Sequence, residues 1–141
     1  MAEQIETKHP RFLLFCRAAA CFYFLFTLYA LLSPRPFGDF EIPIPAFSII
    51  HAAAFAVLGF LFELARGTFS RRIAWFSLLL YGPLTEVLQP LTGRYFEWID
   101  IFEDVVGVTL GVIVARLLLF CFARRRTKET SRPAPDDSAP R

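Results

Sequence analysis

The residues best suited to chemistry lie in one stretch, Tyr81–Gly111, where two long apolar runs meet. The polar side chains of this stretch are Glu86, Gln89, Arg94, Glu97, Asp100, Glu103 and Asp104. Ionisable groups at the edge of apolar helices are costly unless they are paired, so we interpret them first as a site. Carboxylates can hold a divalent cation or transfer a proton, and a guanidinium can pair with phosphate or carboxylate.

Helical spacing sorts these residues into two stripes. The first stripe comprises Gly82, Glu86 and Gln89, and the second comprises Asp100, Asp104, Gly107 and Gly111. Small residues let helix backbones touch in lipid, so we expect the three glycines to serve helix packing and the acidic face to turn inward. Carboxylates one turn apart repel unless they share a cation, a basic partner or a proton. Asp100 and Asp104 are therefore the candidate ligands of a divalent cation.

His51 enters from an earlier apolar run and is expected on the same side as the acidic residues. A lone histidine is more often a hydrogen-bonded structural group than a ligand or base, and both interpretations remain open. His51 and Glu86 are the candidate catalytic residues. The candidate binding residues are His51, Glu86, Gln89, Arg94, Asp100 and Asp104.

Four apolar runs must position these side chains. They are Phe12–Leu32, Ala46–Ala65, Ile73–Leu91 and Val105–Ala123, each about the length that crosses a hydrocarbon core as a helix. Hydrophobic residues make up 55% of the 141, and the mean hydropathy of +0.47 is too apolar for a soluble domain of this size. The sequence therefore predicts an all-α membrane protein, a bundle of four transmembrane helices.

The distribution of basic residues predicts the orientation. Lysine and arginine flank the start of the first run, fill the second connection and follow the last run. The other two connections hold only Arg35 and Arg94. Basic residues mark the cytoplasmic side, so we expect both termini inside and the acidic cluster on the outer face. The first run is too long for a signal peptide and lacks a cleavage pattern, so we expect it to stay in the membrane.

The remaining features favour structural roles. Cys16, Cys21 and Cys121 have neither disulfide nor metal spacing and are interpreted as packing residues. Glu63 and Arg66 are interpreted as a local surface ion pair. Arg116 lies within the last apolar run, so its side chain must either extend to the membrane interface or find a partner on the inner side. No phosphate-binding loop is found, and nucleic acid is not an expected partner.

The expected organisation has three parts. Residues 1–11 form an N-terminal cytoplasmic segment, residues 12–123 the transmembrane domain, and residues 124–141 a disordered cytoplasmic tail that is basic and then proline-rich. The expected surroundings are the lipid bilayer of a plasma or inner membrane, crossed several times.

The order of the polar residues resembles the VanZ-like family of bacterial membrane proteins. The residues that carry the resemblance are His51, Glu86, Gln89, Arg94, Asp100, Asp104, Gly107 and Gly111, and it covers about residues 12–122. The chain departs from the family pattern at Phe47 and Ser48, where an Asp-Lys pair is common, and at Phe55 and Asp104. The family takes its name from a member associated with teicoplanin resistance, so the resemblance implies a role in the cell envelope.

Three functions are open from the sequence. The first is a binding or accessory protein whose outward pocket engages a cell-surface or lipid-linked molecule. The second is a small intramembrane enzyme acting on a lipid-linked precursor, with a divalent cation at Asp100 and Asp104. The third is a polar network that fixes helix register and has no ligand.

Overall fold

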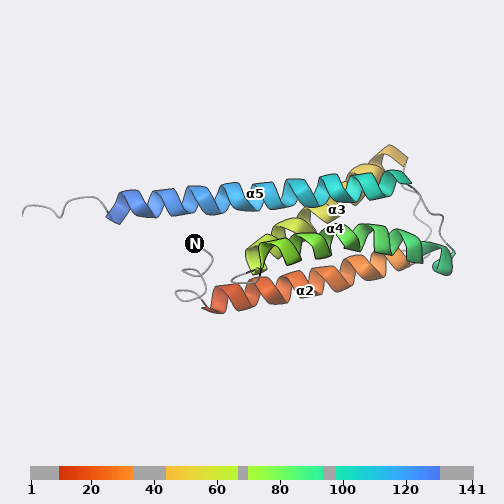
Figure 1. Cartoon of the computed structure of the whole chain (residues 1–141), viewed down its shortest axis with the longest axis horizontal. Helices are drawn as coiled ribbons and strands as arrows, with labels where there is room; N and C mark the ends of the chain where they lie inside the picture. Colours follow the sequence, from red (N-terminus) through yellow and green to blue (C-terminus); the bar gives the residue numbers. More distant parts are fainter. Residues whose placement is uncertain (1–9, 34–43, 67–69, 94–97, 131–141) are drawn as a thin grey trace, which may run out of the picture.

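Four long helices and one short 3₁₀ helix build the described part of the chain, which contains no strand. The computed structural model describes residues 10–33, 44–66, 70–93 and 98–130. The elements are α2 (Pro10–Leu32), α3 (Ile44–Ala65), α4 (Arg71–Leu88), η1 (Gln89–Thr92) and α5 (Trp98–Thr130). All four helices run along the long axis of the molecule, and α5 extends well beyond the others at one end (Figure 1).

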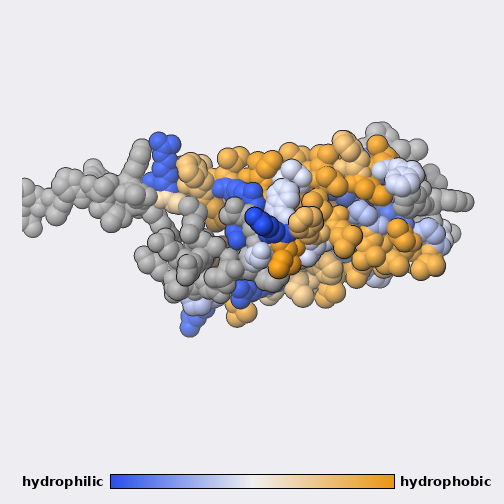
Figure 2. All heavy atoms as spheres, viewed as in Figure 1, coloured by the Kyte–Doolittle hydropathy of each residue, from blue (hydrophilic) through white to orange (hydrophobic). Residues whose placement is uncertain are grey.

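Three of these helices are long and apolar enough to cross a membrane, namely Pro10–Leu32, Ser48–Ala65 and Trp98–Arg125. The 18 residues of α4 include Arg71, Arg72 and Glu86, and α4 is not among the three. The surface over the middle of the bundle is largely apolar (Figure 2), and every long helix carries exposed large hydrophobic side chains. Such a surface suits contact with lipid. The described residues therefore confirm the all-helical prediction and support a protein that crosses the membrane more than once.

The last helix is longer than the apolar run that predicted it. It begins at Trp98 rather than near Val105, because the acidic residues of its first turns interrupt the apolar pattern without interrupting the helix. It also continues past Ala123 to Thr130, into the segment expected to be a disordered tail. Arginine, lysine and glutamate are good helix formers, which allows this extension. The rest of that expected tail, residues 131–141, and the N-terminal residues 1–9 lie outside the described residues.

The most extensive helix pairing joins α3 and α5. Three glycines line this contact, where a Cβ would collide with the backbone or side chains of the partner helix. A Cβ on Gly59 would lie 2.5 Å from the Val108 carbonyl oxygen, and one on Gly111 would lie 2.7 Å from the carbonyl carbon of Ala56. A Cβ on Gly107 would lie 2.9 Å from Phe55 Cβ. Glycine at these positions lets the two backbones touch, and their packing holds the two helices in a fixed register.

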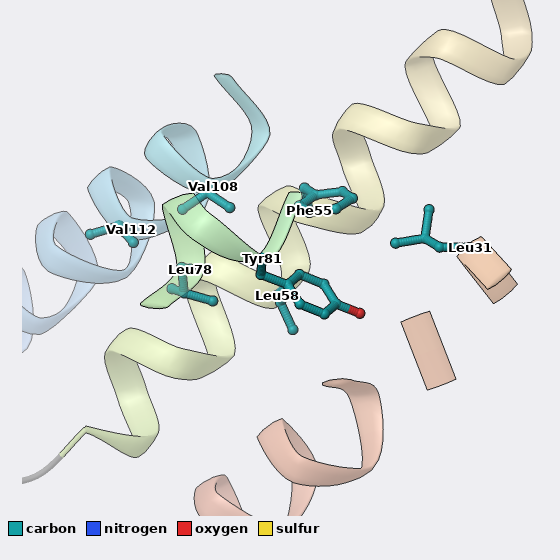
Figure 3. Close-up of a cluster of buried hydrophobic side chains, with 7 residues drawn as sticks. All are labelled: Leu31, Phe55, Leu58, Leu78, Tyr81, Val108 and Val112. Carbon is teal, nitrogen blue, oxygen red and sulfur yellow. The ribbon is translucent and has the colours of Figure 1, made fainter. Parts of the chain in front are cut away.

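The apolar core lies between α3, α4 and α5 and reaches α2. It comprises Leu31, Phe55, Leu58, Leu78, Tyr81, Val108 and Val112 (Figure 3). The Tyr81 hydroxyl is hydrogen-bonded to Thr27 Oγ1 of α2 at 3.2 Å, which satisfies two polar groups inside the bundle. This core packs against the residues that carry the polar side chains described next.

Candidate functional site

Five of the predicted binding residues gather at one end of the bundle. His51 lies near the start of α3, Glu86 and Gln89 at the junction of α4 and η1, and Asp100 and Asp104 near the start of α5. Because α4 runs in the opposite direction to α3 and α5, its last turn meets the first turns of both. We call these five residues the polar cluster. All five are buried, and Glu86 and Gln89 have no exposed surface.

His51 is fixed by contacts on two sides. Its Nε2 lies 2.8 Å from Oδ1 of Asp104, a hydrogen bond between residues that are 53 positions apart in the chain. Its ring stacks on Phe55, one turn further along α3, with the ring centroids 5.2 Å apart. A carboxylate that accepts from one ring nitrogen sets the tautomer and the orientation of the imidazole. The α3–α5 contact therefore determines where His51 points.

Glu86 has a similar support. The Gln89 side-chain amide donates from Nε2 to Glu86 Oε1 at 2.6 Å, because residues three apart share a helix face. The side chains of His51, Glu86 and Asp100 each offer a ligand atom, and these atoms lie within 4.8 Å of one another. The sequence had favoured Asp100 with Asp104 as the pair of metal ligands. The structure instead groups Asp100 with Glu86 and His51, and joins Asp104 to the histidine.

The first stripe also makes room for the second. A Cβ on Gly82 would lie 2.8 Å from Asp104 Cβ and nearer still to its carboxylate, so glycine here admits the acidic side chain between α4 and α5. Two buried oxygens of the cluster, Asp104 Oδ2 and Gln89 Oε1, have no hydrogen-bond partner among the described residues. A buried acceptor without a partner costs roughly 1–3 kcal/mol, so these two atoms call for a donor or a cation.

Arg94, the sixth predicted binding residue, lies outside the described residues, as does Glu97. Glu103 is half-buried on α5, and its Oε2 has no partner within the described part of the chain. The structure thus brings five predicted site residues together and leaves the position of Arg94 as a prediction.

A groove between α2 and α3 adjoins the polar cluster and was not predicted. Its volume is about 350 Å³, and its walls are almost entirely apolar. The lining includes Phe26, Ala30 and Ile50, and the polar residues on it are Tyr23, Thr27 and His51. Tyr23 and Thr27 could have indicated that this face of α2 lines a site, since polar side chains are few in the first apolar run. The groove itself depends on how two helices pack and has no signature in either one.

A second polar group lies further along α3, toward its C-terminal end. Glu63 Oε1 accepts from Arg66 Nη2 at 3.3 Å and from Arg116 Nε at 3.2 Å, and the Arg116 guanidinium lies 5.3 Å from the centre of the Trp75 ring. The predicted ion pair of Glu63 with Arg66 is confirmed, but it is not the isolated surface pair that was expected, because Glu63 is buried and also accepts from Arg116. Of the two alternatives left open for Arg116, the structure shows a partner, the buried carboxylate of Glu63.

Comparison with known proteins identifies no relative of this chain. No family model matches it, and no curated protein or solved structure matches it significantly. The class defined by the fold is therefore a small helical membrane protein with a buried polar cluster at one end of its bundle.

Proposed function

We propose that this protein binds a membrane amphiphile, a molecule with an apolar chain and a polar headgroup, as part of a function in the cell envelope. One observation carries the proposal. His51 belongs to the buried polar cluster and also lines the apolar groove between α2 and α3. A ligand whose chain lies in the groove would present its headgroup to the cluster through this residue.

The size and chemistry of the groove favour a chain rather than a polar molecule. A volume of about 350 Å³ is at the small end of ligand sites, which usually combine apolar walls with a few placed polar groups. Three alanines, Ala30, Ala53 and Ala54, keep the groove open on both helices. The groove would therefore take a segment of an acyl or isoprenoid chain, and the polar groups near one end would select the headgroup.

The proposed arrangement includes α4 as a fourth membrane span. Eighteen residues of helix extend about 27 Å, close to the thickness of the hydrocarbon core. Its polar residues Glu86 and Thr85 are fully buried, whereas Leu80, Leu84 and Val87 are exposed as lipid-facing residues would be. Four spans, with both termini in the cytoplasm of a plasma or inner membrane, would place the polar cluster on the outer side, as the basic residues indicate.

The resemblance to the VanZ-like family supports an envelope role for the same site. Most of the residues that carry the resemblance are those of the polar cluster and two glycines of the α3–α5 contact, Gly107 and Gly111. A lipid-linked envelope molecule has the chemistry that the groove and cluster together would recognise. The proposal is thus a binding or accessory function, of the kind that a glycopeptide-resistance protein could use.

Analysis of co-purified lipids tests the proposal. Protein extracted from its membrane would be washed and its bound amphiphiles compared by mass spectrometry with the total membrane extract. Ala53→Trp fills the groove from an exposed position on α3, and Ala18→Trp adds the same ring to an exposed position on α2 outside the groove lining.

We expect one amphiphile class to be enriched several-fold over the membrane, lost in Ala53→Trp and retained in Ala18→Trp. A lipid profile equal to that of the membrane, or equal losses in both variants, would contradict the proposal. Should Ala53→Trp fail to fold, Ala30→Trp fills the same groove from α2.

A further inference from the structure

We propose that His51, Glu86 and Asp100 bind a divalent transition-metal cation, for which Zn²⁺ is the appropriate probe. The inference does not depend on the amphiphile, because it concerns ions bound by the protein alone. Three helices supply one ligand each: α3 the imidazole, α4 one carboxylate and α5 the other. Such a cation would join the three helices at one end of the bundle.

The donor set matches known ligand preferences. Imidazole suits zinc, iron and nickel, and carboxylate oxygens are accepted by zinc, manganese and iron. Three protein ligands of this kind leave a coordination position open for water or for a headgroup oxygen. The ligand atoms now lie within 4.8 Å of one another, whereas ligands about 2.1 Å from a tetrahedral zinc are roughly 3.4 Å apart. Side-chain movements that shift each ligand atom by about 1 Å would bring the three atoms to these separations.

The second observation is that two of the three ligands already have the outer partners that metal ligands require. Metal-binding histidines usually bond a carboxylate through the other ring nitrogen, and ligating carboxylates are hydrogen-bonded in turn. Asp104 Oδ1 lies 2.8 Å from His51 Nε2, so coordination would use Nδ1. Gln89 Nε2 donates to Glu86 Oε1 at 2.6 Å. Asp104 and Gln89 are positioning residues in this scheme, and neither is a ligand.

One of the two unpartnered buried oxygens of the polar cluster points the same way. Gln89 is fully buried, and its Oε1 has no hydrogen-bond partner among the described residues although its amide nitrogen is held against Glu86. A water molecule on the open coordination position is a donor that this oxygen could accept from. The site would then consist of three protein ligands, one bound water and one acceptor for that water.

Metal content and thermal stability together test the site. Purified protein would be stripped with chelator, reloaded with Zn²⁺ alone, dialysed, and measured for bound metal and for Tm with and without chelator. The variants are His51→Ala and Asp100→Asn for the ligands and Asp104→Asn for the positioning carboxylate. Glu63→Gln is the matched control, since it removes a buried carboxylate at a distance from the cluster.

We expect about one Zn²⁺ per chain, a Tm that falls with chelator and returns with Zn²⁺, and unchanged metal content in Glu63→Gln. Both ligand variants should lose the metal, and Asp104→Asn should bind it about 10–100-fold more weakly. Metal absent from reloaded wild-type protein, or a Tm that does not respond to chelator, would overturn the proposal. Equal metal in wild type and ligand variants would show adventitious binding and overturn it as well. If the variants do not fold, the response of wild-type Tm to chelator decides alone. Amphiphile enrichment is a separate measurement, so either proposal can fail while the other stands.

Discussion

Replacing Gly111 with alanine tests whether the α3–α5 contact positions the site. The new Cβ would lie 2.7 Å from the Ala56 carbonyl carbon and 2.9 Å from the Phe60 backbone nitrogen, and nearer still to the Ala56 oxygen. Carbon atoms in good contact are about 3.5–4.0 Å apart, so α3 and α5 must separate by roughly 0.8 Å or more at this level. All three of these atoms belong to helix backbone, which cannot move aside as a flexible side chain would.

The magnitude follows from two opposing effects. A gap of 0.5–1 Å forfeits about a quarter to a half of the dispersion energy of each contact, and overpacking typically costs about 1–3 kcal/mol. The gain in helix propensity from glycine to alanine is at most about 1 kcal/mol. Gly111→Ala should therefore destabilise the protein by about 1–2 kcal/mol, and Gly107→Ala on the same stripe should act in the same direction.

The measurement is thermal unfolding in detergent, monitored through the loss of the circular dichroism signal of the helices. Val114→Ile is the matched control, because it adds one carbon to α5 at a half-exposed position. We expect a lower Tm for Gly111→Ala and an unchanged Tm for Val114→Ile. If Gly111→Ala is as stable as the wild type, the two backbones do not touch at this point, and the reasoning about the α3–α5 register is wrong.

Two further substitutions probe other parts of the bundle, and a reporter fusion probes its orientation. Leu58→Ala empties a fully buried core position and should cost about 2–5 kcal/mol in the same unfolding assay; a loss below 1 kcal/mol would argue against the described core. Glu63→Ala leaves two arginines without their shared carboxylate and should cost about 3 kcal/mol, the low end for a buried pair because Arg116 is partly exposed. If Glu63→Ala with Arg116→Leu recovers none of that loss, the two side chains are not coupled. A topology reporter fused after Arg141 should be active only in the cytoplasm, and activity on the outer side would reverse the proposed orientation.

Periodicity was sufficient to predict which faces of α4 and α5 turn inward. Glu86 and Gln89 share a face because they are three residues apart, and Asp100 and Asp104 because they are four apart. Both pairs are buried in the structure. The helix ends were less predictable, since the acidic residues near Trp98 break an apolar run but not a helix. Apolar runs report the lipid-facing length of a helix rather than its full extent.

Partners between distant helices could not be predicted. The hydrogen bond of His51 with Asp104 and the ion pair of Glu63 with Arg116 both join α3 to α5 across 53 positions. Each depends on the register between the two helices, which the glycine contacts set. Gly59 was missed for the same reason, because a single glycine has no spacing pattern until its partner helix is known. The groove between α2 and α3 likewise arises only from packing.

Photo-crosslinking in intact membranes tests the proposed function most directly. A photoreactive residue at Ile50, which lines the groove, would be compared with one at Phe76, an exposed α4 residue outside the groove lining. We expect Ile50 to capture one class of amphiphile far above its share of the membrane, His51→Ala to abolish this capture, and Phe76 to capture bulk lipid. Capture of the same bulk lipids at both positions would contradict the proposed function.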